Sequence, residues 1–202
     1  VIGGDVGDQR GVGVLDRELE AAVPARRRPG LSAIFWDVDA PATLAAIHAD
    51  PADPMRLLIP RYDAVLTYGG GENVVNAYTG LGARLCVPIY NALDPETHFE
   101  VTPDPRYEAD LALLANRLPD RERRVEAFFV EPARALPERR FLLGGSGWED
   151  KALPPNVRRL GHVYTASHNA LNASALAVLN VARDSMAACG LSPATRIFQA
   201  AG

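Results

Sequence analysis

Apolar runs alternate along this chain with segments of helical periodicity, and this alternation constrains the fold more than any other feature. The runs are residues 31–36, 64–67, 84–89, 111–115, 141–143, 157–160 and 176–181. Helical periodicity occupies residues 40–49, 72–81, 120–135, 165–173 and 193–201. Continuous apolar runs are typical of strands buried on both faces, and their alternation with helices indicates parallel strands joined by right-handed crossovers. The sequence therefore predicts an α/β fold with parallel sheets.

Residues 91–107 interrupt this pattern and suggest a boundary between two domains. Asp94-Pro95, Pro103 and Asp104-Pro105 break regular structure there. We predict a first Rossmann-like domain over residues 1–95, a linker over 96–108 and a second Rossmann-like domain over 109–202. Each sheet is expected to be incomplete. The chain begins without methionine and stops directly after a helical pattern, so we interpret it as an internal part of a longer protein.

Composition excludes some classes of function. The chain is 48% hydrophobic and 23% charged, which is typical of globular proteins. Its formal charge of −4 argues against a nucleic-acid partner, because binding phosphate backbones requires a basic surface. No apolar stretch reaches the ~18 residues of a membrane span, and no signal peptide is recognisable, so we expect a cytoplasmic protein. Cys86 and Cys189 lie in or beside apolar runs, which favours free thiols over a disulfide.

The first candidate binding residues follow the run at 111–115. In open α/β sheets ligands bind beyond the carboxyl ends of the strands. Asn116 and Arg117 occupy this place, and Pro119 and Asp120 then begin a helix. A helix start binds anions, and an arginine beside it can add a forked contact to phosphate. Arg117 is therefore a candidate pyrophosphate ligand, although it can equally be a surface arginine that caps a neighbour.

Two further loops follow predicted strands. Gly144 and Gly145 begin a glycine-rich loop through which backbone can approach a ligand closely. Its spacing matches neither the phosphate loop of nucleoside triphosphatases nor the dinucleotide fingerprint, so a tight turn remains the alternative. His162 follows the run at 157–160, where a loop can recognise a nucleotide base, or where the histidine is a plain loop residue.

The last segment suggests a second phosphate or ribose site. Ser192 is predicted to cap a helix that has Pro193 at its first position, and a cap alone is the competing interpretation. The candidate ligands in this segment are Arg183, Ser192, Thr195, Arg196 and Gln199.

Asp37 and Asp39 follow the first apolar run and suggest a different chemistry. Phosphatases of the haloacid-dehalogenase type begin with such a pair, in which the first aspartate attacks phosphorus beside a magnesium ion. However, Ala40-Pro41 replaces the Gly-Thr that normally follows, and no later acidic pair stands at a strand end. The phosphatase interpretation is therefore kept as an alternative only.

The motifs together resemble one family. They are FWDVDAP at 35–41, LTYGGG at 66–71, VPIYNALDP at 87–95, NRLPDR at 116–121, FLLGGSGW at 141–148, NVRRLGHV at 156–163, LNV at 179–181, RDSM at 183–186 and the run 192–202. This set is similar to the CgeB-like spore-maturation glycosyltransferases, and the resemblance covers nearly the whole chain apart from its start.

The resemblance implies a GT-B glycosyltransferase with two Rossmann-like domains. The second domain would bind a nucleotide-sugar and the first an unknown acceptor. Arg117 and the run 192–199 match the places that grip the diphosphate and ribose, although Gln199 stands where the wider group usually has glutamate. Asp37 and Asp39 would lie on the cleft side of the first domain. Neither a metal nor a further cofactor is implied, because arginines and helix dipoles stabilise the departing diphosphate.

Two other functions fit the same architecture. A non-catalytic nucleotide-binding scaffold would bind nucleotide without turnover. A sugar-nucleotide epimerase would isomerise the donor without any acceptor.

Overall fold

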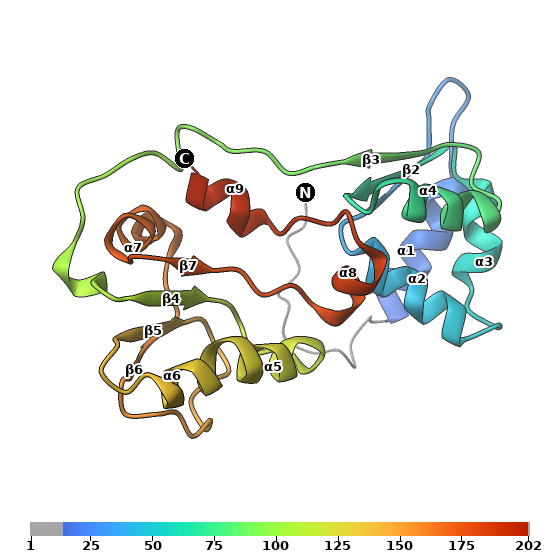
Figure 1. Cartoon of the computed structure of the whole chain (residues 1–202). Coiled ribbons are helices and arrows are strands. Elements are labelled where there is room, and N and C mark those ends of the chain that lie inside the picture. The colour runs from blue at the N-terminus through green and yellow to red at the C-terminus, as the bar shows by residue number, and fades with distance from the viewer. Residues whose placement is uncertain (1–13, 202) are drawn as a thin grey trace. The chain divides into compact units, whose positions relative to one another are not determined.

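The computed structural model describes residues 14–201, which divide between Ile89 and Tyr90 into two compact units (Figure 1). Each unit is an α/β structure with its own parallel sheet, of three strands in the first unit and four in the second. This arrangement confirms the predicted α/β class and fits Rossmann-like, GT-B architecture. No helix among residues 14–201 is long and apolar enough to cross a membrane.

Unit 1 contains the sheet β1-β2-β3. Its elements are α1 (Val14–Ala25), β1 (Ile34–Asp37), α2 (Ala40–Ala49), α3 (Met55–Leu58), η1 (Ile59–Arg61), β2 (Ala64–Tyr68), α4 (Gly71–Gly80) and β3 (Cys86–Ile89). All three strands are parallel, with Ile34 opposite Ala64 and Val65 opposite Cys86. Helices α2 and α4 follow the carboxyl ends of β1 and β2, so polar residues at those ends lie beside helix starts.

Unit 2 contains the sheet β6-β5-β4-β7. Its elements are η2 (Pro105–Tyr107), β4 (Leu111–Leu114), α5 (Pro119–Val125), η3 (Glu126–Val130), α6 (Glu131–Ala135), β5 (Phe141–Gly144), β6 (Val157–Gly161), η4 (Thr165–Ser167), α7 (His168–Ser174), β7 (Val178–Leu179), α8 (Asp184–Cys189) and α9 (Thr195–Ala201). Strands β5 and β6 extend the sheet on one side of β4, whereas β7 pairs with its other side. The direction of chain progression therefore reverses between β4 and β7, which is where open α/β sheets bind ligands.

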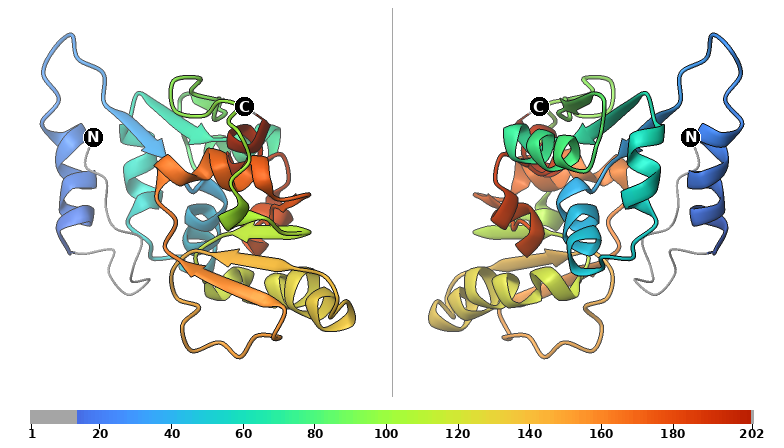
Figure 2. Two further views of the ribbon diagram at one scale, coloured as in Figure 1. Left: turned by 90° about the vertical axis from the view of Figure 1, so that its left-hand side faces the viewer. Right: turned by 90° about the vertical axis from the view of Figure 1, so that its right-hand side faces the viewer.

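Helices cover both faces of the unit 2 sheet (Figure 2). Alternate strand residues point to opposite faces. Leu113 and Leu143 pack with Phe129 beneath α5 and α6, whereas Ala112 and Leu142 pack with Leu171 of α7. Phe129 also meets Phe141 edge to face, with ring centroids 5.5 Å apart.

All seven predicted strands are present, and the helices at 40–49, 72–81, 120–135 and 165–173 are confirmed within a residue or two. The segment 120–135 includes a π-helical stretch, η3, between α5 and α6. Helices α1, α3 and α8 were not predicted. The last helix begins at Thr195 and not at Pro193, which changes the interpretation of Ser192.

Candidate functional site

The loop after β4 carries Arg117, whose guanidinium is already neutralised. Its Nε and one terminal nitrogen donate to the two carboxylate oxygens of Glu122 at 3.0 and 2.8 Å. The other terminal nitrogen donates to Asp150 at 2.8 Å. These carboxylates raise the pKa of Arg117, and the guanidinium carbon lies 5.9 Å from the Trp148 ring centre. A phosphate that binds Arg117 must compete with these two carboxylates.

The loops after β4 and β5 fit tightly against each other at Gly145. The Asn116 side-chain oxygen accepts a hydrogen bond from the Ser146 amide at 3.0 Å, and the Arg117 amide donates to the Ser146 carbonyl at 2.9 Å. A Cβ atom on Gly145 would lie 2.2 Å from the Ala115 carbonyl oxygen. The predicted residues Asn116, Arg117 and Gly145 are therefore brought together. Gly144 ends β5, where a Cβ would lie 2.7 Å from Leu114.

Helices α5 and α8 are joined by ion pairs at the reversal point between β4 and β7. Arg183 donates to Asp120 at 2.7 Å, and Arg124 pairs with Asp184. Arg121 lies in the same place without a carboxylate within ion-pair distance among the described residues. Its Nε is buried without a hydrogen-bond partner, and burial lowers the pKa of Arg121. Asp120 attracts the charge of Arg121 only from beyond ion-pair distance, so three arginines share two aspartates in this cluster.

Helices α7 and α9 form a second polar contact. One terminal nitrogen of Arg196 lies 3.4 Å from His168 Nδ1, and the Asn172 amide donates to the Gln199 carbonyl at 3.2 Å. Asn91 donates to the Thr195 hydroxyl at the start of α9. The predicted residues Arg196 and Gln199 thus contact α7, a helix that the sequence did not assign to the site, whereas Thr195 contacts Asn91.

Two predicted residues have other surroundings. Ser192 does not cap α9: its hydroxyl donates to the Gly190 carbonyl at 3.2 Å, and the helix begins three residues later. This side chain bonds backwards into the preceding loop, so the predicted N-cap is wrong. His162 is exposed at the end of β6, with its ring against Tyr164 and centroids 4.6 Å apart.

Asp37 and Asp39 of unit 1 differ in exposure. Asp37 is 5% exposed, and its carboxylate accepts hydrogen bonds from the Asp39 amide at 3.0 Å, the Thr43 hydroxyl at 3.1 Å and the Tyr78 hydroxyl. Burial raises the pKa of Asp37, whereas these three hydrogen bonds oppose that rise. Asp39 is half-buried at the start of α2. Asp37 is therefore committed to holding the β1–α2 turn in place.

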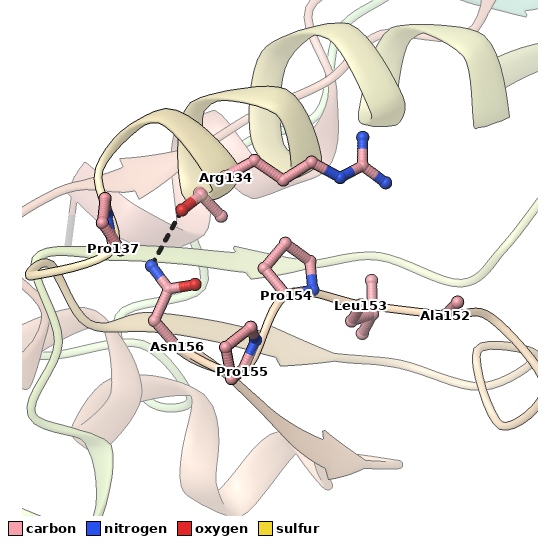
Figure 3. A pocket seen from close by; sticks show the side chains of 8 residues that line it. Arg134, Pro137, Ala152, Leu153, Pro154, Pro155 and Asn156 are labelled. Atoms are coloured by element: carbon pink, nitrogen blue, oxygen red, sulfur yellow. Dashed lines mark hydrogen bonds between the residues drawn. The ribbon is translucent and has the colours of Figure 1, made fainter.

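One pocket of unit 2 lies away from these contacts. A pocket of about 390 Å³ lies at the amino ends of β5 and β6, between α6 and the segment before β6 (Figure 3). Asn156 points into its wall and donates to the carbonyls of Ala133, Leu136 and Arg139, each at 3.0 Å. Ligands of open α/β sheets bind at the opposite, carboxyl edge. This pocket lies beside the C-terminal end of α6, away from the edge where a ligand is expected.

Arg121 and His168 were not predicted as site residues, and His98, whose ring centroid lies 6.4 Å from that of His168, was considered only as a lesser alternative to Asp37 and Asp39. Arg121 is part of the motif at 116–121, and the sequence indicates that it has no ion-pair partner one turn further along its helix. Residues three and four positions along the helix are Arg124 and Val125, so no carboxylate stands where a helical ion pair requires one. The two histidines carried no recognisable spacing.

Comparison with known proteins supports the identity of the second unit. Residues 121–202 match the model of a family described as glycosyl transferase-like. The matched segment begins inside α5 and includes the other strands and helices that follow β4, so it contains Arg121 and Arg196 but not Asp120 or Asn91. No curated protein matched the chain. Residues 121–202, less than half of the chain, are therefore similar to this family.

Proposed function

We propose that the chain belongs to a glycosyltransferase that moves a sugar from a nucleoside-diphosphate sugar to an acceptor, and that unit 2 binds the donor. The family match over residues 121–202 supports the transferase class. The finer assignment to the CgeB-like subfamily rests on the motifs alone. In the proposed division, residues 1–95 form the acceptor side, 96–108 a linker and 109–202 the donor side.

One observation carries the placement of the donor: the described residues of unit 2 hold buried polar atoms that lack partners, and those of unit 1 hold none. These atoms are His98 Nε2, Asp120 Oδ1, Arg121 Nε, Asn172 Oδ1, Ser185 Oγ and Arg196 Nε, together with Glu126 Oε2, which lies 2.9 Å from the Lys151 ammonium. A buried polar atom without a hydrogen-bond partner costs about 1–3 kcal/mol of stability. Proteins retain such atoms where a ligand or a water molecule supplies the missing partner.

The charges agree with this placement. Five arginines of unit 2 are half-buried: Arg117, Arg121, Arg124, Arg183 and Arg196. Three of these pair with carboxylates, whereas Arg121 and Arg196 have no such partner among the described residues. A desolvated charge without a counter-charge is costly, and the two phosphates of a nucleotide-sugar supply the missing negative charge.

The proposed chemistry follows from these groups. Breaking the sugar–phosphate bond leaves negative charge on the nucleoside diphosphate, and fixed arginines stabilise that charge in the transition state without requiring a metal. Arg121 and Arg196 are proposed for this role, with Asn116, Gly144, Gly145, His162, Arg183, Ser192, Thr195 and Gln199 as further donor contacts. On the acceptor side, Asp37 is proposed to position Asp39 through the Asp39 amide.

The test is calorimetric titration of the chain with UDP, GDP, ADP and TDP. We expect one nucleotide to bind selectively and the Arg121→Gln variant to lose that binding. Arg134→Gln is the matched control, because Arg134 lies on the same helical segment but pairs with Glu126 at 2.7 Å. Absence of binding to every diphosphate would overturn the proposal.

A second variant tests whether Arg117 contributes. Glu122 competes with any phosphate for its guanidinium, so Glu122→Gln should tighten nucleotide binding if Arg117 is a ligand. Unchanged affinity would assign Arg117 to structure alone. Turnover of the matching nucleotide-sugar then separates a transferase from a scaffold, which binds without turnover, and from an epimerase, which needs no acceptor.

A further inference from the structure

His168, at the contact between α7 and α9, lies near two of the other three histidines of the chain and beside Arg196. His168 is the first residue of α7, and Arg196 lies in the first turn of α9. The His98 ring lies 6.4 Å from the His168 ring, between centroids. His162 lies close enough to His168 to lower its pKa by charge repulsion. No helical repeat brings these residues together, because they come from four separate segments of unit 2.

The contacts of His168 fix its protonation state. Its Nε2 lies 3.1 Å from the Val163 carbonyl oxygen, which can only accept a hydrogen bond. Its Nδ1 lies 3.4 Å from Arg196, which can only donate. His168 is therefore neutral, with the proton on Nε2. Burial first and Arg196 second lower the pKa of His168, which agrees with this tautomer.

Among the described residues, no carboxylate is among the groups that perturb the pKa of His168. The titratable groups that face it are Arg196 from α9, His98 from the segment before η2 and His162 from the loop after β6. Asp94 lies near His98, but its carboxylate already accepts hydrogen bonds from the Thr97 hydroxyl at 2.7 Å and the Glu96 amide at 3.0 Å. Two nitrogens are left buried without a partner: Nε2 of His98, which is 7% exposed, and Nε of Arg196.

A small pocket opens along the same contact. It has a volume of about 170 Å³ and is lined by Phe99, Glu100, Val101, Asn169, Asn172, Ala173 and residues 199–201. Asn172 and Gln199 line it and are joined by the hydrogen bond described above, so the pocket lies along the same α7–α9 contact that holds His168 and Arg196. The Asn172 side-chain oxygen lacks a partner, and Glu100 and Gln199 add further acceptors, which suit sugar hydroxyls. The volume is below the ~300 to 1,000 Å³ of pockets that enclose drug-sized ligands, so it suits a single ring.

We propose that His98, His168 and Arg196 form a proton-coupled site for a phosphate that is attached to a hydroxyl-bearing ring. The phosphate draws the Arg196 guanidinium away from His168 Nδ1. The freed Nδ1 lone pair takes a proton from solvent, and the resulting Nδ1–H donates to a phosphate oxygen. Identification of the ligand as the diphosphate of the donor rests on the proposed function, whereas the phosphate site itself does not.

The expected pH dependence follows from this step. His168 has a low pKa while Arg196 is bonded to it, and phosphate raises that pKa because it favours the charged ring. Affinity should therefore rise as the pH falls from 8 to 6, by at most about tenfold per pH unit for one proton. Binding at pH 7 should also take up protons from the buffer.

The experiment is calorimetric titration of the whole chain with inorganic pyrophosphate and, separately, with UDP, in Tris and in HEPES. These buffers have different ionisation enthalpies, so the difference between the heats gives the protons taken up. His168→Gln keeps an amide that can donate to Val163 but cannot gain charge, so it should retain part of the affinity and take up fewer protons than wild type. Arg196→Gln should lose at least tenfold in affinity, and Arg196→Lys should recover part of it.

Arg140→Gln is the matched control, because Arg140 is exposed and pairs with Glu108 at 3.0 Å. Trp148 fluorescence confirms that each variant is folded. Unchanged affinity in Arg196→Gln, or equal proton uptake in wild type and His168→Gln, would overturn the proposal. Failure of both ligands to bind would overturn it too. Pyrophosphate binding with proton uptake, but without nucleotide selectivity, would retain this site and reject the transferase donor role.

Discussion

The Gly145→Ala substitution tests the close approach of the loops after β4 and β5. Gly145 has a φ of +117°, and an added Cβ would lie 2.2 Å from the Ala115 carbonyl oxygen and 2.5 Å from its carbon. Those atoms are backbone, so they cannot rotate away as a flexible side chain can. The same oxygen accepts a hydrogen bond from Trp148 Nε1 at 2.7 Å. The substitution must therefore displace Ala115 and disturb Trp148.

The magnitude can be worked out by comparison with Gly161→Ala. Gly161 also has a positive φ, of +66°, but an added Cβ meets nothing within 4 Å. Gly161→Ala should thus cost only the left-handed backbone penalty of about 1–2 kcal/mol. Gly145→Ala carries a backbone cost of about 1–3 kcal/mol. It also loses the Trp148 and Ser146 hydrogen bonds, at about 1 kcal/mol each. We expect about 4 kcal/mol, at least twice the cost of the control.

The assay is urea unfolding followed by tryptophan fluorescence in a Trp36→Phe background. Trp36 is 61% exposed in unit 1, whereas Trp148 is 3% exposed in unit 2, so the remaining signal reports on unit 2. Gly145→Ala should also shift the emission of the native state, because Trp148 loses its hydrogen bond. If the two alanine variants have equal unfolding free energies, the tight packing of these loops is refuted, and with it the argument that glycine is required there.

Three further predictions concern stability. Burial raises the pKa of Asp37, and above that pKa its buried charge reduces the stability of unit 1. The unfolding free energy of unit 1 should therefore fall as the pH rises through that pKa. Urea titrations between pH 4 and 7 should show a weaker fall in Asp37→Asn. Phe129→Ala should cost about 3–5 kcal/mol in unfolding free energy, because this fully buried ring packs on Phe141. Asn156→Asp should lower the thermal midpoint more than Asn156→Ala, since it places a carboxylate against three carbonyl oxygens; equal midpoints would contradict this.

The sequence predicted the strands well because most of them are short apolar runs in parallel sheets, although β1, β3 and β6 are partly exposed. Runs such as 141–143 stay apolar throughout, and β5 is buried along its whole length. Helix α8 escaped prediction because it has six residues without apolar periodicity and is held by the ion pair between Arg124 and Asp184. The π-helical η3 escaped too, since a local change of hydrogen-bond spacing leaves no mark in an apolar pattern.

The candidate site was predicted only in part. The type of a residue and its position after a strand can be seen in a short segment of sequence, whereas its ion-pair partners can come from distant segments. Arg117 was identified from its position after β4, but its neutralisation depends on Asp150, which lies 33 residues away. Arg196 is the reverse case. No acidic residue follows Asp184 in the sequence, so Arg196 has no carboxylate in its own segment, and the structure shows that none pairs with it from elsewhere among the described residues. Arg121 had a similar signal in its helical neighbours.

The two units differ in whether their buried polar groups have hydrogen-bond partners. We infer that this difference distinguishes structural from ligand-binding groups. Asp37 in unit 1 is buried with three donors on its carboxylate, so its surroundings are complete without a ligand. In unit 2 the α5–α8 and α7–α9 contacts contain ion pairs or hydrogen bonds. Each contact also contains an arginine, Arg121 or Arg196, that forms no ion pair with a carboxylate of the described residues. A fold gains no stability from leaving Arg121 and Arg196 in this state. The same arrangement favours any anion that reaches them, and the glycosyl transferase-like segment contains both.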